Sequence, residues 1–424
     1  MPRSLRCLLL LIPLITIAGV ARGDNWPQWR GPHLDGKSDE QNPPVKWSKT
    51  ENIAWRLPLP GRAGATPVVW GDRIFLTSVA EDNDTLLLIC VGTDGKKKWQ
   101  QVLGKGNRDA RVNEGNSASP SPVTDGRHVW TFLGTGILAC HDVDGAEAWK
   151  FDLQDRYGKF DIQFGMTSSP VLDGDRLYMQ LIHGDGNPAT REAVVICLNK
   201  TTGAQIWKQP RPSPASDENE HSYASPTIYR DGKQSFLLTH GADYLVAHDL
   251  DDGHELWRSG GLQPPNYDKT LRLVASPVTA PGLIVAPSAK GGWMIALRPD
   301  GKGDVTGSHL WQYKPTTDVP SPLIDGDLVY VYRENGVLVC LESKTGKKLY
   351  EQRTQEGNNR ASPVLADGKL YLVARDGTTT VVKAGSKFEV LSINKIDESI
   401  TASPALSNGR FYLRTFDALW AIGK

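Results

Sequence analysis

PSPLIDGDLVYVYRENGVLVCLESKTGKKLY, residues 320–350, contains short apolar segments separated by turn residues. Asp325-Gly326 and Asn335-Gly336 are dipeptides typical of tight hairpins, because both residue pairs adopt positive φ at low cost. β-Branched and aromatic residues between these turns indicate strands. Thr345-Gly346 then turns the chain a third time, toward Leu349-Tyr350. The segment therefore predicts a four-stranded antiparallel meander.

The same unit recurs along the chain, and each copy opens with a proline. Proline cannot donate a hydrogen bond to a β ladder, so it belongs at the first residue of a strand or on an edge. The opening prolines are Pro67, Pro122, Pro170, Pro226, Pro277, Pro322, Pro363 and Pro404. They lie 41 to 56 residues apart, which is the period of a four-stranded propeller blade. We therefore predict an all-β chain that forms an eight-bladed β-propeller.

A second marker closes most units: an aromatic residue follows a turn glycine by four residues. The pairs are Gly95 and Trp99, Gly145 and Trp149, Gly203 and Trp207, Gly253 and Trp257, Gly307 and Trp311, and Gly346 and Tyr350. Two independent markers at matching offsets support the repeat, and 42 glycines and 28 prolines fit many short strands and turns.

The last unit lacks a fourth strand. It has its proline, an Asn408-Gly409 turn and two strands, Arg410 to Arg414 and Ala418 to Ile422, and then the chain ends. The alternating segment around Trp55 is the natural substitute, because pairing the two chain ends removes an exposed sheet edge. We therefore expect one propeller domain over residues 47–424.

Residues 24–46 are expected to form an irregular lid on one face of the propeller. The lid contains the pair Trp26 and Trp29, which either packs against the blades or grips a ligand.

Residues 1–23 have the pattern of a signal peptide. Arg3 and Arg6 precede a 13-residue apolar run, and Ala21-Arg22-Gly23 has the small-x-small pattern of a cleavage site. An apolar run of this length is too short to span a bilayer, which needs about 20 residues. The mature chain is expected to be exported to the periplasm or the cell exterior, with an uncleaved anchor as the alternative. Cys7 precedes the apolar run, so no lipoprotein attachment site is predicted.

Charge argues against nucleic acid as a partner. The chain has 48 basic and 48 acidic residues, and loss of Arg3, Arg6 and Arg22 would leave 45 basic against 48 acidic. No basic stripe interleaved with aromatic residues is present. A monomer that binds a protein or an extracellular polymer is the expectation.

The cysteines of the expected mature chain occupy equivalent places in four units: Cys90, Cys140, Cys197 and Cys340. Equivalent positions in neighbouring blades should lie farther apart than the roughly 7 Å between Cα atoms that a disulfide allows. We interpret these residues as buried, small apolar side chains, with disulfides as the alternative.

The segments CLNKTTGAQIW, AHDLDDGHELW and CLESKTGKKLY resemble the tryptophan-docking repeat of the pyrroloquinoline quinone (PQQ) propeller superfamily. That superfamily contains quinoprotein alcohol dehydrogenases and the outer-membrane assembly scaffold BamB, and the resemblance covers residues 47–424. It implies that blade tryptophans lie between blades and stack on a neighbour's peptide. These residues are Trp99, Trp149, Trp207, Trp257 and Trp311, with Trp55 in the closing strand.

The sequence departs from the dehydrogenases of that superfamily. It lacks their adjacent cysteine pair and the Cys-x-x-Cys-His haem motif, and it is shorter than they are. No catalytic, cofactor-binding or metal-binding residue is therefore transferred, and no cofactor is predicted. The Asp-rich segments 142–145 and 249–253 resemble parts of calcium loops but lack a downstream bidentate carboxylate, so turn chemistry explains them.

The loops that enter the innermost strands converge on the mouth of the central channel. Polar residues just before the opening prolines are candidates for a ligand site or, alternatively, ordinary solvated loop residues. The candidates are Glu114, Asn116, His221, Arg272, Asp318 and Arg360.

Three functions are compatible with these features. The leading hypothesis is an exported, non-catalytic binding or scaffold module that uses its loop face. The alternative is a PQQ- and Ca²⁺-dependent dehydrogenase that oxidises an alcohol or polyol. A lyase or hydrolase at the channel mouth is the third, and no sequence feature favours it.

Overall fold

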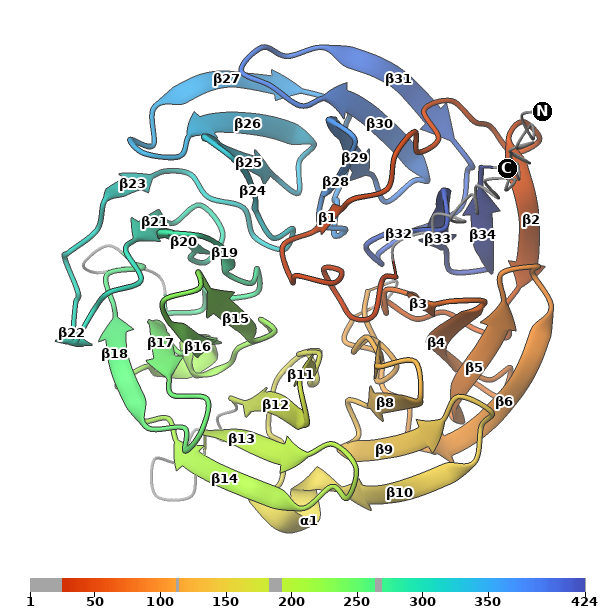
Figure 1. Cartoon of the computed structure of the whole chain (residues 1–424), viewed down its shortest axis with the longest axis horizontal. Coiled ribbons are helices and arrows are strands. Elements are labelled where there is room, and N and C mark those ends of the chain that lie inside the picture. Colours follow the sequence, from red (N-terminus) through yellow and green to blue (C-terminus); the bar gives the residue numbers. More distant parts are fainter. Residues whose placement is uncertain (1–24, 112–113, 183–192, 264–268, 424) are drawn as a thin grey trace, which may run out of the picture.

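The computed structural model describes residues 25–111, 114–182, 193–263 and 269–423. These residues form eight sheets arranged radially around a central axis (Figure 1). The prediction of an all-β, eight-bladed propeller is confirmed. The expected signal peptide, residues 1–23, lies outside the described residues.

The first three blades each contain four consecutive strands. Blade 1 consists of β3 (Val68–Trp70), β4 (Arg73–Val79), β5 (Leu86–Gly92) and β6 (Lys97–Gly104). Blade 2 consists of β7 (Val123–Thr124), β8 (His128–Phe132), β9 (Ile137–Asp142) and β10 (Glu147–Asp152). Blade 3 consists of β11 (Val171–Asp173), β12 (Arg176–Leu181), β13 (Val194–Asn199) and β14 (Gln205–Pro210).

The next four blades continue the ring. Blade 4 consists of β15 (Thr227–Arg230), β16 (Ser235–Gly241), β17 (Tyr244–His248) and β18 (Glu255–Ser259). Blade 5 consists of β19 (Val278–Ala280), β20 (Leu283–Pro287), β21 (Met294–Leu297) and β23 (Trp311–Tyr313). Blade 6 consists of β24 (Leu323–Asp325), β25 (Leu328–Tyr332), β26 (Val337–Glu342) and β27 (Lys348–Arg353). Blade 7 consists of β28 (Val364–Ala366), β29 (Lys369–Val373), β30 (Thr378–Lys383) and β31 (Val390–Lys395).

Two blades have a fifth strand that the sequence did not predict. β22 (Gly303–Asp304) pairs in parallel with β18 on the outside of blade 4. β1 (Lys37–Ser38) pairs in parallel with β28, the innermost strand of blade 7. Both are two residues long and depend on contacts between distant segments, which leave no periodic pattern in the sequence.

Blade 8 joins the two ends of the chain. It consists of β32 (Ala405–Ser407), β33 (Arg410–Arg414), β34 (Ala418–Ile422) and β2 (Ile53–Pro58). β2 is antiparallel to β34, with Trp55 opposite Ala421 and Leu57 opposite Leu419. The expected donation of an N-terminal strand to the last blade is therefore confirmed.

Helices contribute little to the described residues. They are α1 (Leu153–Tyr157) and the 3₁₀ turn η1 (Asp217–Glu220). The side chain of Asp152 caps α1 by accepting a hydrogen bond from the Gln154 amide. Within the described part of the chain, neither helix is long and apolar enough to cross a membrane.

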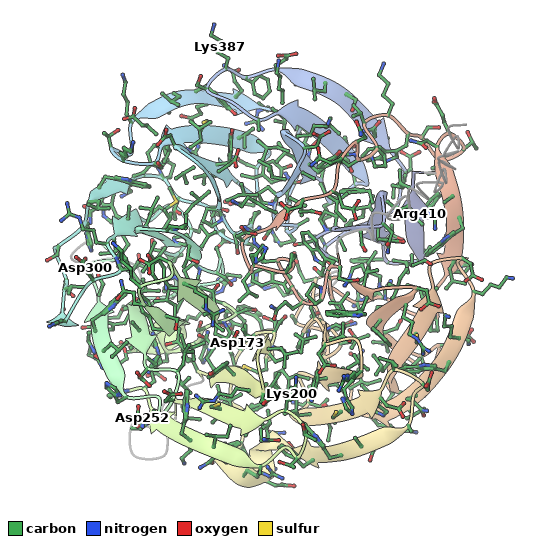
Figure 2. All side chains as sticks on the ribbon, in the orientation of Figure 1. Asp173, Lys200, Asp252, Asp300, Lys387 and Arg410 are labelled. Atoms are coloured by element: carbon green, nitrogen blue, oxygen red, sulfur yellow. The ribbon has the colours of Figure 1, made fainter. Side chains whose placement is uncertain are left out.

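Each opening proline lies one residue before its innermost strand, and not at the first strand residue as expected. The hairpin that follows turns at positive φ, as Gly326 (+55°) does after Asp325. Figure 2 places Lys387, Asp300 and Asp252 at the edge of the disc and Asp173 nearer the axis.

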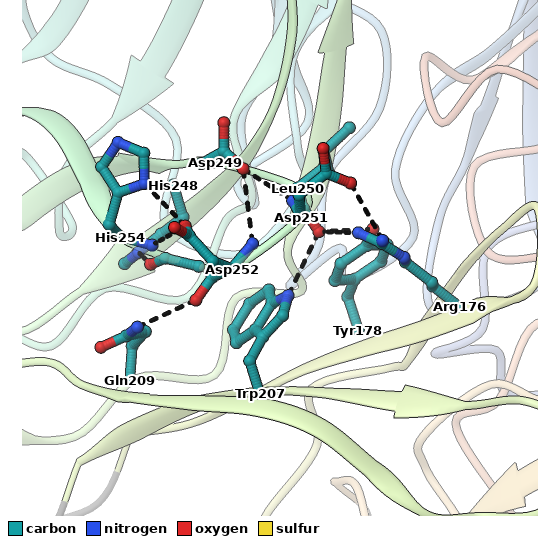
Figure 3. A network of polar contacts seen from close by, with 11 residues as sticks. Arg176, Tyr178, Trp207, Gln209, His248, Asp249, Leu250, Asp251, Asp252 and His254 are labelled. Atoms are coloured by element: carbon teal, nitrogen blue, oxygen red, sulfur yellow. Dashed lines mark hydrogen bonds and ion pairs between the residues drawn. The ribbon is translucent and has the colours of Figure 1, made fainter.

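Tryptophans on the outer strands contact the turn of the following blade. Figure 3 shows Trp207 of blade 3 beneath the turn between β17 and β18 of blade 4, with its indole Nε1 donating to the Leu250 carbonyl at 3.1 Å. Gly253 of that turn lies so close that an added Cβ would be 2.5 Å from the indole. Glycine is therefore required where one blade rests on the next.

The same contact recurs around the ring. The donors and acceptors are Trp55 and Thr93, Trp99 and Val143, Trp149 and Lys200, and Trp311 and Ser343. Trp257 is buried against Gly301, and its Nε1 has no hydrogen-bond partner among the described residues. Each indole buries a large apolar area between two sheets, which holds adjacent blades together.

The cysteines lie opposite these aromatic residues in the ladder. Cys90 pairs with Trp99, Cys140 with Trp149, Cys197 with Trp207 and Cys340 with Tyr350. All four are buried and none of them forms a disulfide, as expected. Burial raises the pKa of the Cys90, Cys140 and Cys197 thiols to about 12.

Candidate functional site: the channel mouth

The plug segment, residues 25–46, closes the central channel from one face. It starts beside the β3–β4 turn, where the Gly71 amide donates to Asn25, pairs with β28 near the axis, and reaches the outer strand β31 at Val45 (Figure 1). Arg30 donates from Nη1 to the Pro363 carbonyl at 3.0 Å and from Nη2 to the Pro322 carbonyl at 2.6 Å. The guanidinium is buried, which lowers the pKa of Arg30 to about 10.

Further contacts attach the plug segment to blades 7 and 8. The Glu40 carboxylate accepts hydrogen bonds from the amides of Asn408 and Gly409 at 2.6 and 2.9 Å. The Tyr371 hydroxyl donates to the Pro44 carbonyl at 3.0 Å. Trp26, one of the expected lid tryptophans, is buried and bridges to Val69.

The channel mouth is a cavity of about 240 Å³ on the opposite face. Trp29, the second lid tryptophan, lines it from the plug segment. Serines that precede the opening prolines form its wall: Ser121, Ser169, Ser225, Ser276, Ser321, Ser362 and Ser403. We call the face that contains this mouth and the connections between blades the loop face.

These serines form a chain of hydrogen bonds around the channel. The amide of each one donates to the Oγ of the next, from Ser121 through Ser403, at 2.9 Å. Thr66 occupies the equivalent place in blade 1, and its amide donates to Ser121 at 3.0 Å. A hydroxyl residue precedes every opening proline in the sequence, and this regular pattern was a signal for the hydrogen-bonded ring that the prolines alone did not give.

Four of the six candidates from the sequence line the cavity: Glu114, Arg272, Asp318 and Arg360. Asn116 does not. Its side chain is buried, where its Nδ2 donates to the Arg62 carbonyl and its Oδ1 accepts from the Ala118 amide. His221 does not line the cavity either, and its amide donates to the Glu218 carbonyl. Asn116 therefore shapes the loop and does not face the channel.

Two arginines bind the Glu114 carboxylate. Arg360 donates to both carboxylate oxygens, at 3.0 and 2.9 Å, and Arg375 donates to Oε1 at 2.9 Å. Burial alone would raise the pKa of Glu114, but the hydrogen bonds and charges of these arginines outweigh burial and hold it below its usual value. Glu114 is therefore a fixed anion that joins blades 1 and 7.

Phe164 contacts two further arginines of the mouth. The guanidinium carbon of Arg111 lies 4.2 Å from the ring centroid and that of Arg272 lies 4.7 Å from it. Tyr223 holds the Phe164 backbone, since its hydroxyl accepts a hydrogen bond from the Phe164 amide at 3.3 Å, and the two rings contact each other at a tilt with centroids 6.1 Å apart. Arg111 and Tyr223 also line the cavity and were not among the candidates from the sequence.

Asp318 is the second carboxylate of the mouth. Burial, followed by the nearby Glu334 carboxylate, raises its pKa, and Arg272, Arg360 and Lys290 offset this only in part. Its amide donates to Glu334 Oε2 at 3.1 Å.

The donor set of the mouth does not fit calcium. Ca²⁺ takes six to eight oxygen ligands, commonly from several carboxylates. Glu114 is occupied by two guanidiniums, and the mouth adds only Asp318. Among the described residues, the group of acidic and histidine side chains whose ligand atoms converge is Asp249, Asp252 and His254, on the outer turn in Figure 3.

That outer group is accounted for by turn chemistry. Asp249 Oδ1 accepts a hydrogen bond from the Asp251 amide at 2.7 Å, and Asp252 Oδ1 contacts His254 Nδ1 at 2.6 Å. The Asp252 carboxylate accepts a hydrogen bond from His254 Nδ1, which raises the pKa of His254. These contacts shape the turn that receives Trp207.

A family model described as outer membrane protein assembly factor BamB matches residues 134–304 and 301–387, which is more than half of the chain. The chain belongs to the BamB family. A BamB from Yersinia pestis, described as an outer membrane protein assembly factor, is 22% identical over 315 residues, which are 73% of this chain and 71% of that protein.

Solved structures with the same fold include BamB and quinoproteins. BamB from Moraxella catarrhalis is 15% identical with a TM-score of 0.62, over 88% of this chain and 97% of that one. A europium-containing methanol dehydrogenase is 12% identical with a TM-score of 0.69, over 92% and 89%. A quinohemoprotein alcohol dehydrogenase from Comamonas testosteroni is 12% identical with a TM-score of 0.68, over 94% and 81%. At these identities the likeness concerns the fold alone.

Proposed function

We propose that this chain is an exported, non-catalytic binding module that presents its loop face to a protein partner in the cell envelope. The observation that carries the proposal is the charge arrangement of the mouth. Glu114 is bound by Arg360 and Arg375, so it is not poised as a base or a nucleophile. The description of the matched family as an outer membrane protein assembly factor agrees with a partner-binding role.

The position of the plug segment supports binding of the partner on the loop face. Because Arg30 and its neighbours occupy the channel at the opposite face, the cavity opens toward the connections between blades. Loops held by a rigid scaffold are where binding residues concentrate. The eight blades then serve to fix the loops in space.

Site-specific photocrosslinking in the organism that makes this chain tests the proposal. A photoreactive residue replaces Glu356, which is exposed beside the mouth, or Lys344, which is exposed on a turn at the other face. A discrete protein adduct from position 356 and none from position 344 is expected. Adducts from 344 alone would contradict the use of the loop face.

The same protein tests the quinoprotein alternative. PQQ and Ca²⁺ are added to the purified chain, and reduction of an artificial electron acceptor is followed with a panel of alcohols. No turnover is expected, since the donor set of the mouth does not fit calcium. Alcohol-dependent dye reduction would overturn the non-catalytic proposal.

A further inference from the structure

The arginines of the mouth are unequally matched by carboxylates. Arg360 is paired with Glu114. Arg272 meets Glu218 through one contact, from Nη1 at 3.4 Å, and its buried Nε has no hydrogen-bond partner among the described residues. Arg111 forms no ion pair with any residue that the structure describes. The surplus of positive charge therefore lies at Arg111 and Arg272.

Phe164 holds this surplus in one place. Both guanidinium carbons lie within 5 Å of its ring centroid, at 4.2 and 4.7 Å, so two like charges share one aromatic platform. Each guanidinium lies against the same ring, and an anion that reaches both gains charge-assisted hydrogen bonds from each. A carboxylate matches the planar donors of a guanidinium.

The size of the cavity limits the kind of molecule that can carry the bound carboxylate. A volume of about 240 Å³ is below the roughly 300–1,000 Å³ of pockets that enclose a drug-sized molecule. It is sufficient for one side chain that enters from the loop face. Asp318 lines the same cavity, so its carboxylate repels every incoming carboxylate and disfavours entry of more than one.

We propose that the channel mouth receives a single glutamate side chain of the partner protein, with its carboxylate bound between Arg111 and Arg272. Its methylene stem contacts the aromatic wall of Trp29 and Tyr223. The inference rests on the proposed function and specifies the chemistry by which the loop face recognises its partner.

Binding of short blocked peptides tests the inference. The probe is acetyl-Gly-Ser-Glu-Ser-Gly-amide, the matched control peptide has Gln in place of Glu, and free glutarate represents a small-molecule source. Affinities are measured by saturation-transfer NMR titration at low salt. The glutamate peptide is expected to bind at least tenfold more tightly than the glutamine peptide and more tightly than glutarate.

Protein variants locate the site. Arg272→Gln and Arg111→Gln should each weaken binding of the glutamate peptide at least fivefold, and Asp318→Asn should strengthen it because a repelling charge is lost. Arg353→Gln, on the outer strand of blade 6, is the matched control and should change nothing. Thermal melts confirm that each variant is folded.

Equal binding of the Glu and Gln peptides, or equal loss in the Arg353 variant, would overturn the inference. If glutarate binds and the glutamate peptide does not, the site is one for a small-molecule carboxylate and the inference is overturned. Loop-face crosslinks from position 356 in the absence of peptide binding would leave the proposed function standing and remove this inference alone.

Discussion

The amide of Ser169 donates to Oγ of Ser225 at 2.9 Å, although the two residues are 56 positions apart in the chain. Ser225 in turn donates its own amide to Ser276 at 2.9 Å. Blades 2 to 7 thereby each supply an acceptor to one neighbour and a donor to the other. The donating amides belong to buried residues that precede a proline and lie outside the strands, so no sheet provides them with an acceptor. The serine hydroxyls accept these hydrogen bonds instead.

Ser225→Ala should destabilise the protein by about 1–3 kcal/mol, since it leaves the buried Ser169 amide without an acceptor. Ser225→Thr keeps a hydroxyl that can accept from the Ser169 amide and is expected to recover most of the loss. Urea denaturation measures both. A Thr variant as unstable as the Ala variant would show that side-chain volume, and not the hydrogen bond, governs this position.

Gly253→Ala should be strongly destabilising, because the new Cβ would lie 2.5 Å from the Trp207 ring and Gly253 has a φ of +78°. Gly232→Ala is the matched control in the same blade, with a φ of +82° and no atom within 4 Å of the new Cβ. The control loses only the stability that a left-handed backbone conformation costs an alanine, about 1 kcal/mol. Thermal melting should separate the two variants by several degrees, and equal melting temperatures would contradict the docking role of the Trp207 contact.

Trp47 packs at the seam between blades 7 and 8, with its ring centroid 5.4 Å from Phe411 and 6.5 Å from Tyr371. Because it is 4% exposed, Trp47→Ala is expected to cost about 3–5 kcal/mol. Trp70→Ala provides a comparison, since Trp70 is 37% exposed and should cost clearly less. Chemical denaturation curves of both variants give the difference in the free energy of unfolding. A Trp47 variant no less stable than the Trp70 variant would contradict a stabilising role of Trp47 between blades 7 and 8.

The stability of the fold should fall as the pH drops below about 6.5. Burial lowers the pKa of His240 to about 3 and that of His248 to about 4, from 6.5. Between these values the unfolded chain binds protons that the folded chain does not, so acid favours unfolding. Each histidine then removes about 1.4 kcal/mol of stability per pH unit.

His240→Gln tests this dependence, because a glutamine amide can donate to the Pro287 carbonyl that His240 Nε2 contacts at 2.7 Å. The free energy of unfolding, measured in urea between pH 7 and pH 5, should fall less steeply for the variant than for the wild type. Parallel profiles would contradict the assignment of this acid sensitivity to His240.

The strands were predictable because their boundaries depend on local backbone chemistry. Asn408-Gly409 illustrates this: both residues have positive φ, at +55° and +69°, in the turn that the dipeptide indicated. The blade count followed from the prolines for the same reason. The contacts of Arg30 with Pro322 and Pro363 were not predictable, since they join residues about 300 positions apart.

The candidate site was predictable only in outline. The loops that hold Glu114, Arg272, Asp318 and Arg360 converge because of the propeller geometry, so position in the repeat was sufficient. The direction of a side chain in an irregular loop depends on its tertiary partners. Asn116 therefore turned away to bind backbone groups, while Arg111 joined Phe164 without any sign in the repeat.

The pairing of β2 with β34 has a consequence for biogenesis. A polypeptide emerges from the ribosome, and from a translocation pore, in the order of its residues, but residues 53–58 find their partner strand only when residues 418–422 have appeared. Residues 53–58, which include Trp55, therefore wait unpaired for nearly the whole of translation. Chaperones that shield extended apolar segments are expected to engage this end of the nascent protein and to release it last.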